Sequence, residues 1–251
     1  MGIDWLVLVV DEIRNIAHRA NMKVSVEWGD CCRLLGRGSM HVFSCEQFQK
    51  LMNASSFSGP WHSLVDLGAG DGATTAHVAH LFEKVYATDI SAPMRWALAK
   101  SPWLKFITEL SPFNVILCLN LLDRCDRPNT LLRRLRASLA PGGRLVVALV
   151  LPFSPYVEVG ERGDHKPSEY LPVKGNGLEG QIASLVDRVF APLSLRCLAW
   201  SKLPYLCEGD LSQAYYFLDD VVFVLEAQPV STQSCEFSIR NVSRISHPRS
   251  F

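Results

Sequence analysis

The sequence carries no excess of either charge. Its 251 residues include 25 Lys and Arg and 25 Asp and Glu. Proteins that bind nucleic acid gather positive charge against the phosphates, and this chain has no such surplus. We therefore expect no nucleic-acid partner. A chain that is 48% hydrophobic has enough apolar material for one globular domain.

A long hydrophobic run is also missing. The run Trp5–Val10 is only six residues long and ends at Asp11 and Glu12, whereas a membrane-spanning helix needs roughly 20 apolar residues. No basic residue precedes this run, as one would in a secretory signal. The expectation is an intracellular protein without a transmembrane segment, cytoplasmic from the sequence itself.

The chain lacks paired cysteine motifs. Its eight cysteines form no C-x-x-C pair, and several lie inside apolar runs. They are expected to be buried thiols in a reducing compartment rather than disulfides or zinc ligands. His77 and His80 share a helical face, but no third or fourth ligand has a fitting spacing, so we expect no metal.

What is present from Ser63 onward is an alternation of short apolar runs with helical patterns, which is typical of βαβ units. The fold class is therefore expected to be α/β and Rossmann-like, with a mainly parallel sheet and an antiparallel C-terminal edge strand. A Pro- and Gly-rich stretch, 152–180, predicts a long loop. The expected strands are 63–67, 84–90, 113–119, 144–151, 193–202 and 221–227, and the expected helices are 73–82, 92–100, 128–139 and 179–190.

A glycine-rich turn follows the first of these strands. Residues 66–72 read DLGAGDG, and a helical pattern follows. Gly68 and Gly70 allow a sharp turn and a close approach of a ligand that a Cβ would block. Together with Ala73 they also satisfy the G-x-G-x-x-G/A pattern of NAD enzymes, so the glycines alone leave the cofactor open.

Acidic residues around this turn favour a cationic cofactor. Asp66 precedes the first glycine and Asp71 lies within the turn, where either carboxylate would repel the pyrophosphate of a dinucleotide. S-adenosylmethionine brings a sulfonium and an ammonium, which suit such a site. Asp89 lies 19 residues after Gly70, near the spacing of a ribose-binding acid. Asp89 could instead be a solvated residue that caps the next helix.

Longer strings elsewhere carry a specific resemblance. They are LLGRGSM (34–40), CLNLLDRCDRP (118–128), ALVLPFSPYVE (148–158), LPYLCEGD (203–210) and YYFLDD (215–220). Over roughly residues 34–227 the chain resembles the DREV (methyltransferase-like protein nine) family, whose members are protein-histidine N-pros methyltransferases. The resemblance implies a Rossmann-like class I methyltransferase domain at 34–227, a divergent segment at 1–33 and a disordered tail at 228–251.

The resemblance also implies an activity and its residues. The expected reaction is methylation of Nδ1 of histidine in His-x-His motifs of protein substrates, by a monomer that uses S-adenosylmethionine. The family has members in the endoplasmic reticulum or mitochondria, so either compartment is an alternative. Cofactor binding is carried over to Arg37, Asp66, Gly68, Gly70, Asp71, Asp89 and Asn120, and the histidine pocket to Asn120, Asp123, Tyr205 and Tyr216.

The chemistry gives Asp123 and Asn120 distinct roles. If a carboxylate accepts the proton on Nε2 of the target imidazole, the lone pair lies on Nδ1 and the imidazolium formed by transfer is stabilised. Asp123 is the candidate for that acceptor, and Asn120 would orient the ring. Both follow the carboxyl end of a strand, where open α/β sheets bind ligands. They could instead cap the following helix.

One stretch departs from the family. Residues 101–112 are too few for the family's third strand and the loop beside the adenine, for which Glu109 is a weak substitute. This leaves a non-catalytic or weakly active variant that binds substrate proteins as one alternative. Methylation of a small molecule is another.

Overall fold

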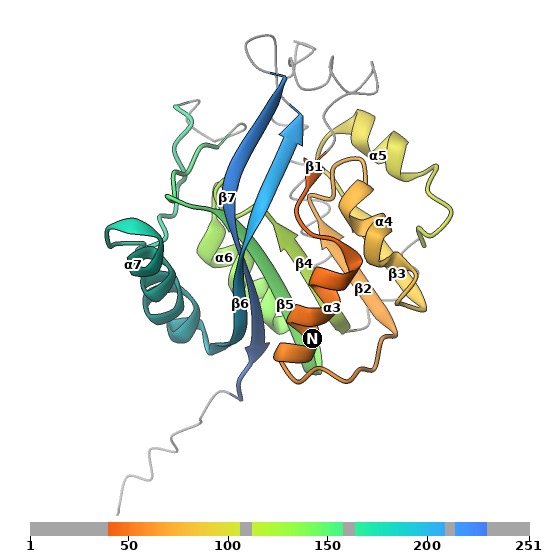
Figure 1. Cartoon of the computed structure of the whole chain (residues 1–251), viewed down its shortest axis with the longest axis horizontal. Helices are drawn as coiled ribbons and strands as arrows, with labels where there is room; N and C mark the ends of the chain where they lie inside the picture. The colour runs from red at the N-terminus through yellow and green to blue at the C-terminus, as the bar shows by residue number, and fades with distance from the viewer. Residues whose placement is uncertain (1–39, 106–111, 158–163, 209–213, 230–251) are drawn as a thin grey trace, which may run out of the picture.

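The computed structural model describes residues 40–105, 112–157, 164–208 and 214–229. They form a seven-stranded sheet in the order β1-β6-β7-β5-β4-β2-β3 (Figure 1). The strands are β1 Met40–His41, β2 Ser63–Leu67, β3 Lys84–Thr88, β4 Phe113–Leu119, β5 Leu139–Val150, β6 Leu195–Glu208 and β7 Tyr215–Ala227. β3, β2, β4 and β5 are parallel, and β7, β6 and β1 continue the sheet in antiparallel pairing. This is the expected Rossmann-like α/β fold.

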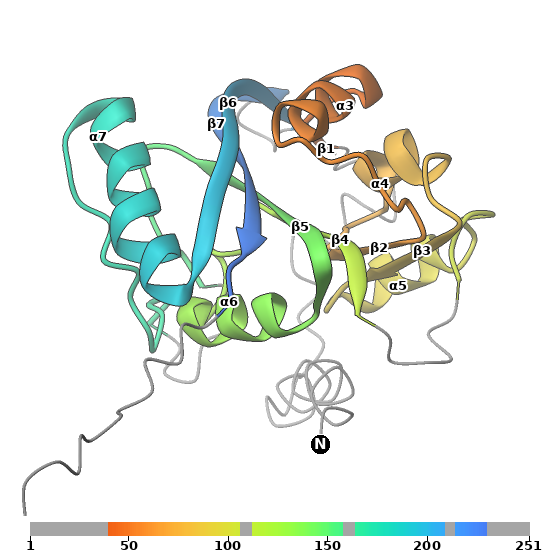
Figure 2. The ribbon, with the colours of Figure 1, turned by 90° about the horizontal axis from the view of Figure 1, so that it is seen from below.

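Helices cover both faces of the sheet. They are α3 Cys45–Ala54, α4 Ala73–Ala79, α5 Ala92–Leu98, α6 Pro128–Ala137 and α7 Gly177–Ser184, which continues as a π-helix over Leu185–Phe190 and a short 3-10 turn at Ala191–Leu193. In Figure 2, α3 and α4 lie on one side of the sheet and α6 on the other. α3 begins with a capping box, in which Ser44 and Gln47 each bond the other's backbone N–H.

Alternation along the strands produces a hydrophobic core on each face. On β2, Leu64 packs with α3 and α4, whereas Val65 and Leu67 belong to the cluster that includes α6 and α7. The same alternation places Asp66 on the α3 and α4 face. The central strands are therefore fixed in register, because a shift of one residue would exchange the two faces.

The structure corrects the expected C-terminal hairpin. Residues 203–220 were expected to be mainly a connection, but β6 extends to Glu208 and β7 begins at Tyr215. Pro204, which argues against a strand in sequence, is accommodated opposite Asp219. β6 is also not the sheet edge, since β1 pairs with it through Met40 and Cys207. The hairpin thus carries two regular side-chain faces.

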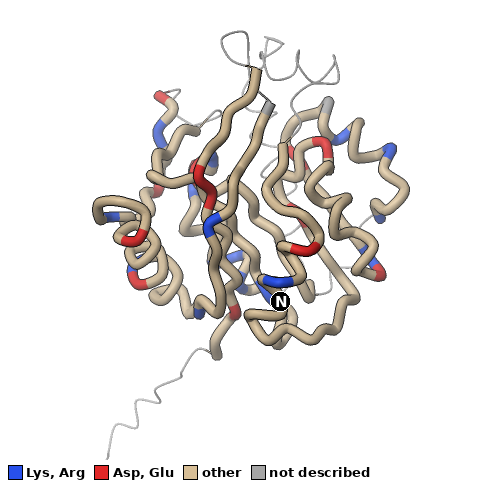
Figure 3. The backbone as a smooth tube through the Cα atoms, in the orientation of Figure 1, with Lys and Arg blue, Asp and Glu red and all other residues tan. Residues whose placement is uncertain are grey.

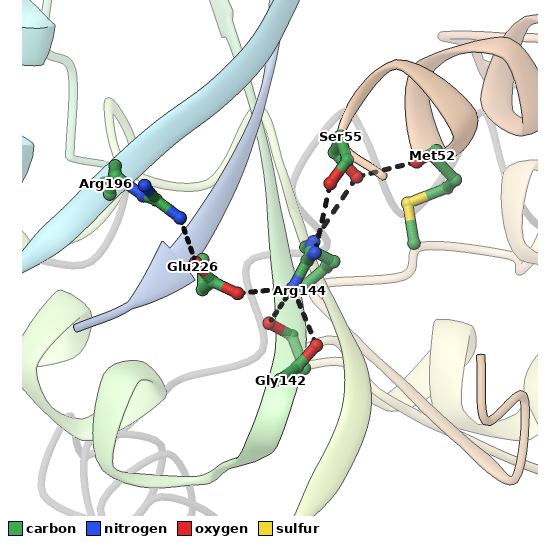
Figure 4. Close-up of polar contacts among 7 residues, drawn as sticks. Met52, Ser55, Gly142, Arg144, Arg196 and Glu226 are labelled. Atoms are coloured by element: carbon green, nitrogen blue, oxygen red, sulfur yellow. Dashed lines mark hydrogen bonds and ion pairs between the residues drawn. The ribbon is translucent and has the colours of Figure 1, made fainter. Parts of the chain in front are cut away.

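Arg144 lies at the end of the sheet where the parallel strands begin, and its side chain bonds several elements there (Figure 4). Its guanidinium donates to Glu226 Oε1 at 3.0 Å and to the carbonyl oxygens of Ser55 and Gly142 at 3.0 and 2.7 Å. Glu226 also pairs with Arg196 at 2.8 Å. This network ties the end of α3 to β5 and β7.

Lys and Arg residues and Asp and Glu residues are interspersed over the part of the molecule seen in Figure 3.

The expectation of buried cysteines is partly wrong: of the five cysteines in the described residues, only Cys118 is buried, and all five are free thiols. Cys31, Cys32 and Cys235 lie outside these residues. None of the described helices is long and apolar enough to cross a membrane.

Candidate functional site

The glycine turn joins β2 to α4 at the carboxyl end of the parallel strands. Gly68, Gly70 and Gly72 all have positive φ, at 68°, 58° and 82°, a region that side chains rarely adopt. A Cβ on Gly72 would lie 2.8 Å from Cδ2 of Leu98. The turn is therefore a backbone cradle that other residues could not form, as a closely approaching cofactor requires.

Asp66 lies beneath this cradle. Its carboxylate is 2% exposed, and Oδ2 accepts a hydrogen bond from Thr75 Oγ1 at 2.5 Å. Within the described residues Oδ1 has no hydrogen-bond partner. Burial raises the pKa of Asp66 to about 7, against the opposing effect of the Thr75 bond. A cation bound in the cradle would favour the ionised form.

Asp89 reaches the glycine turn from the end of β3. Its Oδ2 accepts from Gly70 N at 2.9 Å, and its Oδ1 accepts from Ser91 N at 2.8 Å. Asp89 therefore joins the glycine turn to Ser91, the residue before α5, and its binding of a ribose stays a prediction. Asp71 is exposed and accepts from Ala73 N at 3.0 Å, at the beginning of α4.

Leu104 lies beyond β3 and forms a parallel bridge with Val85, and Lys105 N donates to Val85 O at 2.8 Å. This is the pairing seen in the described part, 101–105, of the stretch expected to be too short for the family's third strand. Ile90, next to Asp89, is 44% exposed. Glu109 and Arg37 lie outside the described residues.

Asn120 begins the second half of the site, directly after β4. It has φ of 51°, and its backbone N donates to Ala148 O at 3.0 Å. Its side-chain Nδ2 donates to Asp220 Oδ2 at 3.0 Å, although the two residues are 100 positions apart. Asn120 is thus held by two neighbouring strands, β5 through its backbone and β7 through its side chain.

Asp220 is the site residue that sequence reasoning missed. It is 0% exposed, and burial raises its pKa to about 6, with Asn120 acting in the opposite direction and Asp123 in the same one. Backbone hydrogen bonds from Val221 and Leu149 also act to lower the pKa of Asp220, whereas Asn120 Oδ1 is buried without a hydrogen bond from any described residue. The sequence feature that could have predicted this burial is the position of Asp220 immediately before the apolar run Val221–Leu225, because such runs form buried strands.

Asp123 lies in the turn that follows Asn120. It is 7% exposed, and Arg124 Nε lies 3.2 Å from its Oδ2. The alternative that Asn120 or Asp123 caps the next helix is not observed, because α6 begins at Pro128 after Arg127 and has no side-chain cap. Asp123 influences the pKa of both Asp220 and Tyr205, so these groups are neighbours.

The two tyrosines come from the C-terminal hairpin. Tyr205 on β6 is 7% exposed, its OH donates to Met40 Sδ at 3.0 Å, and burial raises its pKa well above the usual range. Tyr216 on β7 is half-buried, opposite Cys207 in register. Since side chains alternate, Tyr216 lies on the same face of β7 as Asp220.

Met40 connects the two halves of the site. Its carbonyl oxygen accepts from Thr74 Oγ1 on α4 at 3.2 Å, while its sulfur accepts from Tyr205. The helix that follows the glycine turn is therefore linked through β1 to the hairpin that carries the aromatic residues.

Comparison with known proteins assigns the family. A model described as DREV methyltransferase matches residues 10–227, more than half of the chain. The chain belongs to the DREV methyltransferase family. Its membership confirms the expected methyltransferase fold and S-adenosylmethionine as the cofactor. The match also extends into the N-terminal segment set apart above as divergent.

Solved methyltransferase structures are similar at low identity. One is the N-methyltransferase NodS from Bradyrhizobium japonicum WM9 in complex with S-adenosyl-L-homocysteine, at 17% identity and a TM-score of 0.46, covering 73% of this chain and 87% of that one. Another is an S-adenosylmethionine-dependent methyltransferase from Clostridium acetobutylicum, at 11% identity and a TM-score of 0.49, covering 74% and 91%.

Proposed function

We propose that this DREV-family chain transfers a methyl group from S-adenosylmethionine to Nδ1 (N-pros) of a histidine in a His-x-His motif of a protein substrate. The observation that carries the proposal is Asn120 Oδ1, a buried acceptor directly after β4 that no described residue satisfies. A buried acceptor without a donor costs free energy. An imidazole N–H, or the imidazolium that methylation forms, supplies such a donor.

The cofactor half would use the acidic and glycine residues already described. Gly68, Gly70 and Gly72 form the turn with positive φ that side chains rarely adopt, and Asp66 and Asp89 place carboxyl groups beneath and beside it. When bound, S-adenosylmethionine supplies an electrophilic methyl group. Asp71, Arg37 and Asn120 complete the set we assign to the cofactor.

The substrate half would select one imidazole nitrogen. Asp123 accepts the proton on Nε2, so that the lone pair lies on Nδ1. Asn120 orients the ring through its amide, and Tyr205 and Tyr216 border it with aromatic surface. The residues contribute mainly by alignment, because methyl transfer needs the nucleophile in line with the methyl and its leaving group. We assign this work to a domain at 34–227, acting as a monomer, with 1–33 and the tail 228–251 outside it.

The deciding experiment is methyl transfer from labelled S-adenosylmethionine to a peptide with a His-Ala-His motif. We expect label on histidine, recovered as the N-pros isomer after acid hydrolysis. Matched peptides with either histidine replaced by glutamine serve as controls. Calorimetric binding of S-adenosylmethionine without transfer to the peptide, or transfer to the N-tele nitrogen, would contradict the proposal.

A second function has one observation in its favour. Among the described residues beyond β3, 101–105, a single bridge at Leu104 pairs with β3, which fits a non-catalytic family variant that binds substrate proteins. That function predicts no S-adenosylmethionine binding at high micromolar concentration but retained binding of the His-Ala-His peptide.

A further inference from the structure

Asp220 lies behind Asn120 rather than beside the place of the substrate. Asp220 is wholly buried on β7, whereas Asn120 is half-buried at the end of β4. Their side chains meet through Asn120 Nδ2 and Asp220 Oδ2 at 3.0 Å. A ligand that approaches this pair therefore meets Asn120 first.

The chemistry of the pair fixes the direction of the amide. An ionised carboxylate can only accept hydrogen bonds, whereas an amide has one end that donates and one that accepts. Asn120 must therefore turn its Nδ2 toward Asp220, which leaves its Oδ1 as the other end. Without Asp220, either end of the amide could face the substrate.

We propose that Asp220 is a positioning residue, which holds the Asn120 amide with its oxygen toward the substrate so that the site accepts an imidazole carrying its proton on Nε2. This inference rests on the proposed function, and it explains how a residue that does not touch the substrate favours transfer to Nδ1. An amide turned the other way would present two donors and favour the wrong tautomer.

The surroundings of Asp220 support a role beyond packing. Its neighbours along the inward face of the hairpin are apolar, among them Leu218, Val222 and Leu203, so a hydrophobic side chain would fill this position without the cost of burying a carboxylate. Asp123 raises the pKa of Asp220, Asp220 in turn raises the pKa of Tyr205, and Arg124 lies close to Asp123. Protonation of Asp220 would release the constraint on the amide, so activity should fall as the pH drops below about 6.

The first test is a double-mutant cycle with Asp220→Asn and Asn120→Ala in the full chain. Asp220→Asn alone should lower kcat for the His-Ala-His peptide by roughly 10- to 100-fold, the range for partners that orient a reacting group, and S-adenosylmethionine affinity should be unchanged. In the Asn120→Ala background the same change should have little further effect, because the residue it positions is gone. Additive losses would overturn the inference.

Asp219→Asn is the matched control. It makes the same substitution one residue away, on the exposed face of β7, where Asp219 pairs with Lys202 at 2.8 Å. We expect kcat of the control to equal that of the wild type. Equal turnover of Asp220→Asn and the wild type would also overturn the inference, even though the proposed function stood.

A second measurement does not depend on activity. In ¹⁵N-labelled full-length protein, the Asn120 side-chain amide signals should titrate with an apparent pKa of about 6 and should lose this titration in Asp220→Asn. Signals that do not change with pH in the wild type would overturn the inference. A wild type that transfers no methyl to histidine would count against the proposed function alone, since the titration would still decide whether Asp220 holds the amide.

Discussion

The hydroxyl of Thr75 on α4 donates to Oδ2 of Asp66 on β2 at 2.5 Å, inside the face of the sheet that α3 and α4 cover. This bond ties the strand before the glycine turn to the helix after it. It satisfies only one carboxylate oxygen, and burial still raises the pKa of Asp66 to about 7. Asp66, which we assign to the cofactor site, therefore destabilises the folded protein in the absence of a bound cation.

Asp66→Asn should stabilise the cofactor-free protein at high pH. The pKa of Asp66 in the folded protein is above the unfolded value of 3.8. At a pH between these two values the folded protein therefore binds more protons than the unfolded chain, so the free energy of unfolding falls as the pH rises from about 4 to about 7. Asparagine removes that charge but keeps an acceptor for Thr75. At pH 8 we expect the free energy of unfolding, measured in urea, to be about 1–3 kcal/mol higher for the variant than for the wild type, and we expect a smaller difference at pH 5.

The same variant should bind S-adenosylmethionine more weakly, because the negative charge beneath the cradle is lost. Calorimetry at pH 8 measures this. Asp219→Asn, on an exposed ion pair, serves as a control for both measurements. An Asp66→Asn protein with the wild-type dependence of stability on pH would contradict the raised pKa.

Gly72→Ala should disrupt the turn more than Gly142→Ala. Both glycines have positive φ, at 82° and 72°, so both substitutions carry a backbone cost of about 1–2 kcal/mol. Only at Gly72 does the new Cβ meet other atoms, at 2.8 Å from Leu98 Cδ2 and 3.0 Å from the Trp103 ring, whereas nothing lies within 4 Å at Gly142. Overpacking adds about 1–3 kcal/mol.

Urea unfolding of the two variants isolates the cost of this contact, and calorimetry with S-adenosylmethionine should show weakened binding for Gly72→Ala alone. Equal losses of stability in the two alanine variants would mean that Leu98 and Trp103 yield to the methyl group.

Asp123→Asn should keep cofactor affinity and lose most methyl transfer. The amide can donate as well as accept, so it no longer holds the imidazole proton on Nε2, and we expect kcat to fall on the order of 100-fold. Steady-state kinetics with the His-Ala-His peptide, together with calorimetric S-adenosylmethionine binding, check both halves of the prediction.

Asp126→Asn provides the comparison for Asp123. Asp126 lies in the same turn but accepts hydrogen bonds from Ser168 N and Oγ at 2.8 and 2.9 Å, a role in holding the following loop. Its turnover should stay close to that of the wild type. Undiminished turnover of Asp123→Asn would remove Asp123 from the mechanism.

The sequence was most informative where structure is local. The bounds of β2 and β4 agree with those expected from their apolar runs, and the glycine turn with Asp89 at its usual spacing is brought together as expected. These features depend on periodicity and on turn chemistry within about 20 residues.

Features that depend on distant pairing were not predicted. Asp220 is significant only because β7 lies beside β5, so that it meets Asn120 from 100 residues away. Pro204 and the nearby turn residues argued against strands at Tyr205 and Tyr216. The two segments are strands because β6 and β7 pair with each other.

Arg144→Met should destabilise the fold much more than Arg196→Met. The Arg144 side chain is only 7% exposed and bonds Glu226, Ser55 and the Gly142 carbonyl, whereas Arg196 is 56% exposed and bonds Glu226 alone (Figure 4). Loss of a buried partner costs about 3–5 kcal/mol, and an exposed ion pair contributes about 1 kcal/mol or less. Urea unfolding compares the two variants.

S-adenosylmethionine affinity of the folded proteins should not change, since this network lies at the opposite end of the parallel strands from the glycine turn. Equal destabilisation by both substitutions would mean that the buried guanidinium of Arg144 stabilises the fold no more than the exposed Arg196–Glu226 pair.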